Sequence, residues 1–297
     1  MLSSEAFVTT EDGVRLFVRS VGSGSRPVII PSASFLSDAF RRLAAADRTL
    51  VFYDLRNRGR SDHVDDSSKL ARGIQHDVDD LEAVRAHVGV SGVDLIGHSY
   101  MGLMVALHAM KYPAHVRRVV QIAPAAPYHG RKYPAHLTGA DETLMDISAK
   151  LAQLQANRQF EDPQALGQKM WGLMRMLYVA DPADADKVFW PTDLPNESAA
   201  NVMKHWSENI APSIERLNLT AEDLAGVKVP VLIIHGVKDR HAPYGGAREW
   251  AIGLPDARLV TIDDAAHMPW IEAPDAVFNS IATFLGGAWP EAALRIT

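Results

Sequence analysis

VDLIGHSYMG, residues 93–102, places Ser99 at the point where a buried strand is followed by a helix. The short apolar run before the serine is typical of a strand inside a parallel sheet. A serine on such a tight turn projects its hydroxyl above the sheet edge, and the N-terminus of the next helix directs backbone N–H groups to the same place. The stretch therefore predicts a nucleophilic serine at position 99, with a serine that only caps the helix as the alternative.

The rest of the chain alternates short apolar runs with segments of helical spacing. The predicted strands are residues 7–10, 14–19, 28–30, 49–54, 93–97, 116–122, 230–236 and 258–262, and the predicted helices are residues 72–88, 100–110, 245–252 and 274–285. This alternation predicts an α/β fold with a mostly parallel, eight-stranded sheet and helices on both faces. About the last ten residues are expected to form a loose tail.

The alternation is interrupted once. Residues 127–226 carry helical patterns, several prolines and many Met and Trp residues, but no convincing strand. The sequence therefore predicts a core domain made of residues 1–126 and 227–297, with residues 127–226 as a helical insertion.

Composition limits the class of protein. The chain has 297 residues, about 47% of them apolar, a formal net charge of -6 and no cysteine, which excludes disulfides, thiolate zinc sites and cysteine nucleophiles. The apolar runs are too short to cross a bilayer, and the N-terminus lacks the pattern of a secretory signal. No basic stretch of the kind that binds nucleic acid is present in the sequence. The twelve histidines show no paired metal-ligand spacing. These features favour a cytoplasmic protein that acts on a small molecule without metal, and they leave the oligomeric state open.

Two further polar side chains follow later strands. Asp239 comes after the strand that ends at residue 236, and His267 comes shortly after the strand that ends at residue 262. Ligands bind at the C-terminal edge of an open parallel sheet, where all three residues are expected to lie. A lone aspartate there is usually a turn residue and a lone histidine usually a structural one. Their order and context together predict a Ser99–His267–Asp239 triad.

Over nearly its whole length the chain resembles the α/β-hydrolase superfamily. The motifs are GHSYMG (97–102), DLRNRGRSD (54–62), HGVKDRHAP (235–243) and AAHMPWIEAPD (265–275). The resemblance implies a serine hydrolase of the esterase or proline-iminopeptidase-like branch that forms an acyl-enzyme on Ser99 without a cofactor. It also implies that the insertion is a lid over the active site. Asp54 and Arg56 are expected to stabilise their loop rather than to take part in chemistry.

Two positions depart from the family pattern. Met101 occupies a place that usually holds a small residue, so its neighbours must be small. The usual His-Gly of the oxyanion loop is replaced within Pro31-Ser32-Ala33-Ser34. Because backbone donors survive a change of side chain, the N–H groups of Ala33 and Tyr100 are expected to form the oxyanion hole. The Ser34 hydroxyl is a candidate substrate contact, and the alternative is an ordinary polar loop residue.

Large apolar side chains in the insertion point to the substrate. Trp171, Met174 and Trp206 are expected to line an apolar acyl or ring pocket, although packing within the lid is the alternative role for each. The segment Pro195-Asn196-Glu197 resembles one in the lid of proline iminopeptidases, where a glutamate binds the substrate's amino group. Glu197 is thus a candidate substrate residue, and a helix start with Asn196 as its cap is the other reading.

Hydrolysis of a carboxylic ester or lactone is the first expectation, because it asks least of the site. The alternative is a proline-iminopeptidase-like aminopeptidase. A lyase or a non-enzymatic ligand receptor on the same fold stays open. Epoxide and haloalkane hydrolases are disfavoured, because their elbow carries an aspartate in place of Ser99.

Overall fold

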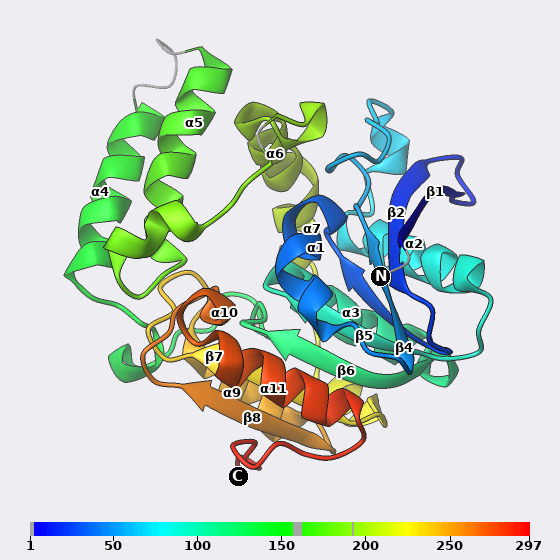
Figure 1. Ribbon diagram of the computed structural model, residues 1–297. Coiled ribbons are helices and arrows are strands. Elements are labelled where there is room, and N and C mark those ends of the chain that lie inside the picture. Colours follow the sequence, from blue (N-terminus) through cyan, green and yellow to red (C-terminus); the bar gives the residue numbers. More distant parts are fainter. Residues whose placement is uncertain (1–2, 157–161, 192) are drawn as a thin grey trace.

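The fold is built on one eight-stranded sheet, seen in a computed structural model that describes residues 3–156, 162–191 and 193–297 (Figure 1). The strand order is β1-β2-β4-β3-β5-β6-β7-β8, with β1, β2 and β4 joined antiparallel and all other pairs parallel. The strands are β1 (Ser3–Thr9), β2 (Arg15–Gly22), β3 (Arg26–Pro31), β4 (Arg48–Tyr53), β5 (Val93–His98), β6 (Val116–Ile122), β7 (Val231–Gly236) and β8 (Ala257–Ile262). The predicted mostly parallel sheet is confirmed.

Burial explains why the central strands read as apolar runs. Every residue of β5 and β7 is buried, because helices cover both faces of a parallel sheet. The edge strand β1 is exposed at all positions except Val8. Ser99 and Asp239 therefore follow strands that are buried throughout, whereas His267 follows the edge strand β8.

Helices cover both faces of the sheet (Figure 1). One face carries α1 (Ala33–Phe40) and α11 (Pro274–Leu285), which meet through the rings of Phe40 and Phe278. The other carries α2 (Ile74–Val88), α3 (Tyr100–Lys111) and α9 (Tyr244–Gly253). The helix α1 and the short α10 (Pro269–Glu272) were not predicted from the sequence.

The C-terminal tail is docked, so the expectation of a loose tail is wrong. Leu294 exchanges two backbone hydrogen bonds with Leu259 of β8, at 2.8 and 2.9 Å, and Ala293 is buried. Because β8 is the edge of the sheet, its outer N–H and C=O groups are free to pair with a passing segment.

The segment 127–226 lies between β6 and β7 and carries α4 (Glu142–Ala156), α5 (Pro163–Met174), α6 (Ala199–His205), α7 (Ala211–Glu215) and α8 (Ala221–Gly226). Its described residues contain no strand. In Figure 1 the helices α4, α5 and α6 stand above the sheet, whereas α8 packs against α3 and α9. Every helix in the described ranges falls short of the length or the apolar character that a membrane span requires. The domain boundaries at 126/127 and 226/227 stay a prediction.

Candidate active site

Ser99 sits in a strained turn between β5 and α3. Its φ of 57° and ψ of -124° lie in a region that residues other than glycine rarely adopt. Hydrogen bonds from Ser99 N–H to Ile122 and from Ala125 N–H to Ser99 hold the turn, at 2.9 and 3.1 Å. A Cβ on Gly97 would lie 2.2 Å from the Met101 carbonyl oxygen. Only glycine at position 97 therefore lets the turn close.

Ser99, His267 and Asp239 form one hydrogen-bonded chain. The Ser99 Oγ lies 2.9 Å from His267 Nε2, and His267 Nδ1 lies 2.8 Å from Asp239 Oδ2. The other oxygen of Asp239 accepts backbone N–H bonds from His241 and Ala242, at 2.8 and 2.7 Å. The three residues thus meet at the C-terminal edge of the sheet, as the order of their motifs predicts.

The electrostatic surroundings keep Asp239 ionised. Burial alone would raise its pKa, but His267 and hydrogen bonds with His235 and His267 hold the pKa well below its usual range. His235 Nε2 lies 3.1 Å from Asp239 Oδ2 and 3.0 Å from the Ala242 carbonyl oxygen. Asp239 can therefore orient His267 at any pH near neutrality.

His98, next to the serine, has a packing role. Its Nε2 lies 2.9 Å from the His267 carbonyl oxygen, and its ring meets Trp270 edge-on at 4.7 Å. Burial, and then the adjacent His267, lower the pKa of His98 well below its usual value. A neutral His98 therefore supports the loop that carries His267.

The two expected oxyanion donors begin α1 and α3, the helices that follow the neighbouring strands β3 and β5. Ala33 starts α1 after Ser32, which has a left-handed φ of 73°, and Tyr100 starts α3 after the strained serine. Among the described residues, neither backbone N–H has a hydrogen-bond acceptor. Such unpaired groups at helix N-termini favour a negative charge.

A cavity of about 1040 Å³ opens above the serine and is lined by both the sheet edge and the segment 127–226. Trp171, Met174 and Trp206 line it, as expected from the sequence. Aromatic rings form one wall. The ring centroids of Trp171 and Trp190 are 4.3 Å apart, and those of Tyr178 and His267 are 5.0 Å apart. The Met101 side chain also borders this space.

Glu197 lies outside the cavity, so the structure does not bring it to a substrate amine. It is 3% exposed, and its oxygens accept two bonds from Arg58 at 2.9 Å and one from the Gly59 N–H at 2.7 Å. Asn196 donates to the Ser61 carbonyl at 2.7 Å. The segment 195–197 therefore fastens the insertion to the loop after β4.

Ser34 is also occupied elsewhere. Its N–H and hydroxyl both donate to Asp54, at 2.7 and 2.6 Å, and Ser34 does not line the cavity.

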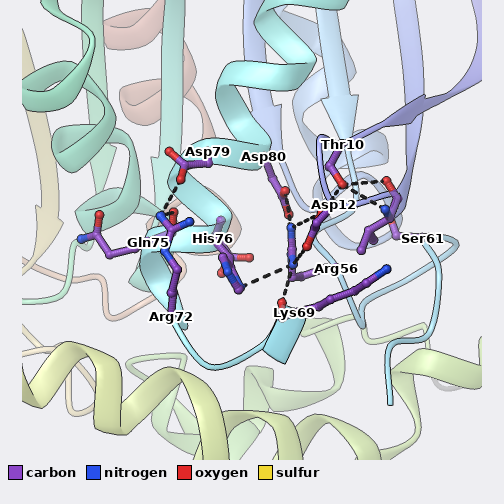
Figure 2. Close-up of polar contacts among 12 residues, drawn as sticks. Thr10, Asp12, Arg56, Ser61, Lys69, Arg72, Gln75, His76, Asp79 and Asp80 are labelled. Carbon is purple, nitrogen blue, oxygen red and sulfur yellow. Dashed lines mark hydrogen bonds and ion pairs between the residues drawn. The ribbon is translucent and has the colours of Figure 1, made fainter. Parts of the chain in front are cut away.

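Arg56 is held between Asp80, at 2.6 and 2.8 Å, and Asp12, at 2.9 Å (Figure 2). Asp54 and Arg56 thus stabilise the loop of residues 54–62.

Several residues that line the cavity were not predicted from the sequence, among them Arg58, Asp77 and His241. Asp77 is 2% exposed, its Oδ2 accepts a hydrogen bond from the Tyr100 hydroxyl, and its Oδ1 has no partner among the described residues. One signal was present, because Asp77 falls on the apolar stripe of α2 between Ile74 and Leu81. An acid there is out of place in a helix that only packs.

Asp77→Asn is expected to stabilise the protein at pH 8 but not at pH 4. Burial, reinforced by Asp80, raises the pKa of Asp77 from 3.8 to about 7. Between these values the folded chain retains a proton that the unfolded chain releases, so the wild type loses stability as pH rises through this window. A shift of this size corresponds to about 4 kcal/mol, which an amide that does not titrate avoids. Thermal unfolding of both proteins from pH 4 to pH 8 measures the difference in stability between the variant and the wild type.

Asp79→Asn is the matched control on the same helix. Burial alone would raise the pKa of Asp79, but bonds from Lys111, Arg72 and Tyr112 lower it. This control is therefore expected to gain nothing at pH 8. A gap between Asp77→Asn and the wild type that does not change with pH would contradict the argument.

Comparisons with known proteins agree with this architecture. The family model described as "alpha/beta hydrolase fold" matches residues 31–274. The chain is 28% identical to the bifunctional esterase/perhydrolase DCH of Acinetobacter calcoaceticus, over 90% of this chain and 95% of that one. It is 23% identical to a proline iminopeptidase of Heyndrickxia coagulans, over 95% and 98% of the two chains.

A solved structure shares the fold. The esterase EaEST of Exiguobacterium antarcticum superposes with a TM-score of 0.69 and 16% identity, and the match covers 95% of this chain and all of the other. Because the family model spans most of the sequence and the sheet has the expected order, the chain belongs to the α/β-hydrolase fold family.

Proposed function

We propose that the protein is a serine hydrolase that cleaves a carboxylic ester or lactone of a small, mainly apolar substrate through an acyl-enzyme on Ser99. The observation that carries the proposal is the hydrogen-bonded chain from Ser99 through His267 to Asp239, placed at the floor of an aromatic cavity. The esterase activity in the name of the Acinetobacter relative supports the same reaction class.

In the proposed reaction, the three side chains and two backbone donors carry out acyl transfer in two stages. His267 Nε2 takes the proton of the Ser99 hydroxyl as the oxygen attacks the carbonyl carbon, and Asp239 stabilises the resulting imidazolium. The N–H groups of Ala33 and Tyr100 donate to the oxyanion. His267 then protonates the departing alcohol, and a water deprotonated by the same histidine releases the acid from Ser99. No step calls for a metal or an organic cofactor.

The segment 127–226 acts in this proposal as a lid that supplies the apolar wall. Trp171, Met174 and Trp206 belong to it, and burial of an apolar substrate between these side chains contributes binding energy in proportion to the area removed from water. The cytoplasmic location stays a prediction from the cysteine-free sequence.

Wild-type protein is expected to hydrolyse p-nitrophenyl esters of short and aromatic acids and to leave aminoacyl-naphthylamides intact. An aminopeptidase needs an acid that binds the substrate's amino group, and the sequence candidate for this role, Glu197, is paired with Arg58. Release of nitrophenolate and of naphthylamine is followed in parallel. Cleavage of the amides alone would favour the iminopeptidase alternative, and turnover of neither class would favour a lyase or a ligand receptor.

A further inference from the structure

One end of the cavity is polar. Arg58 from the loop after β4, Asp77 from the first turn of α2 and Tyr100 from the start of α3 all line it, and we call these three residues the polar end. The proposed acyl transfer uses the side chain of none of these three residues. Of their other groups it uses only the backbone N–H of Tyr100. The cavity lining also includes the apolar or aromatic side chains of Leu55, Met101 and Trp206 and the buried imidazole of His205.

Asp77 offers an acceptor without a donor. The carboxyl group is enclosed by protein, and only its Oδ2 is occupied, by the Tyr100 hydroxyl. The Oδ1 atom has no partner in the described part of the chain. Buried polar atoms are almost always hydrogen-bonded, and an orphan carboxyl oxygen beside a cavity is satisfied when a bound molecule brings a donor.

Arg58 offers a donor without an acceptor. Its Nε and Nη2 bind Glu197, whereas its Nη1 has no hydrogen bond to any described residue. The side chain stays 23% exposed and borders the cavity. Arg58 is also close enough to Asp77 to lower the pKa of that carboxyl against the larger effect of burial. One residue with a free donor and one with a free acceptor therefore both line this cavity.

The charges at the polar end favour a neutral ligand group. Glu197 already neutralises the guanidinium of Arg58, with two contacts of 2.9 Å. Asp77 has a pKa of about 7, so near neutral pH it is only partly charged. An ammonium suits only the charged carboxylate, whereas a hydroxyl both donates and accepts and suits either form. A carboxylate would meet the acidic groups Asp77 and Glu197, and the Arg58 guanidinium is already paired with Glu197.

We propose that the polar end binds a hydroxyl group of the substrate, remote from the scissile bond, with Arg58 donating to its oxygen and Asp77 accepting its hydrogen. The inference rests on the proposed function, because it names a feature of the substrate of the same site. The substrate class is then an ester with an apolar or aromatic body and one alcohol or phenol group at its far end.

Binding is tested apart from hydrolysis with the Ser99→Ala protein. The ligands are 3-(4-hydroxyphenyl)propanamide and 3-phenylpropanamide, which differ only in the hydroxyl, and titration calorimetry gives both Kd values. We expect the hydroxylated amide to bind about 10- to 100-fold more tightly, as for hydrogen bonds that involve charged groups. Adding Asp77→Asn, which places an NH₂ group where an acceptor is needed, is expected to remove most of the preference. Adding Asp79→Asn, outside the cavity on the same helix, is expected to keep it.

Kinetics give the second readout. The ratio of kcat/KM for the p-nitrophenyl esters of 3-(4-hydroxyphenyl)propanoic and 3-phenylpropanoic acid is expected to be about 10 to 100 in the wild type and to fall toward 1 in Asp77→Asn. A structural role of Asp77 alone would change both esters equally and leave the ratio intact, which would overturn the inference. Equal Kd values for the two amides would overturn it as well. A preference for the hydroxylated amide in a protein that cleaves no ester supports the polar end and rejects the proposed hydrolysis.

Discussion

Ser99→Ala is expected to lower kcat for p-nitrophenyl esters by about 10⁴- to 10⁶-fold, the largest effect of any single change in the chain. The methyl group of alanine has no acidic proton to give to His267 and cannot form an acyl-enzyme. Only the oxyanion donors and the cavity then remain to accelerate the reaction. Alanine removes one oxygen from a turn that stays held by its backbone bonds to Ile122 and Ala125. The loss is therefore expected in kcat and not in the thermal unfolding temperature. Stopped-time assays with each purified protein measure the loss.

Labelling with a fluorophosphonate gives an independent readout. Intact-mass spectrometry is expected to show one adduct on the wild type and none on Ser99→Ala. Ser91→Ala is the matched control, because Ser91 is an exposed serine just before the same strand β5. Undiminished ester hydrolysis by Ser99→Ala would place the chemistry at another residue.

Asp239→Asn is expected to lower kcat by about 10³- to 10⁴-fold while the fold is kept. The backbone N–H groups of His241 and Ala242 fix the carbonyl oxygen of the new amide on their side. Its NH₂ group then faces His267 Nδ1 and donates to it, so the proton of the imidazole moves to Nε2. In that tautomer His267 cannot accept the proton of Ser99.

The readouts for this variant are kcat/KM and the rate of fluorophosphonate labelling, both of which depend on deprotonation of Ser99. Asp263→Asn serves as control, because Asp263 is exposed in the loop that leads to His267. Equal rates for Asp239→Asn and the control would show that another group orients the histidine.

The sheet and the meeting of the three polar side chains were predictable from the sequence. Apolar runs flanked by helical patterns imply parallel strands, and parallel strands bring the residues that follow them to one edge. Ser99, Asp239 and His267 each follow such a run, so their proximity needs no knowledge of side-chain packing. The helices α2, α3, α9 and α11 were predicted from the helical spacing of their apolar residues. The bounds of α11 are the predicted ones.

What the sequence did not predict depends on contacts between distant segments. The tail is docked because β8 has a free edge, which no local pattern of the last residues reveals. Glu197 is directed away from the cavity because Arg58, 139 residues earlier in the chain, pairs with it. Asp77 lines the cavity because α2 packs beside α3. Each of these outcomes is decided by which neighbour the fold supplies.

The attachment of the insertion on both sides of α4 and α5 determines which part of the protein can be exchanged. Before α4, Asp141 pairs with Arg240 at 2.6 Å, and after α5, Glu197 pairs with Arg58. The helices between these points supply much of the cavity wall, including Trp171 and Met174, and none of the proposed reacting groups. A chimera that replaces only residues 142–174 therefore keeps these two ion pairs and the proposed reacting groups. This helical pair is the natural unit to exchange if the proposed hydrolysis is to be redirected to new acyl groups.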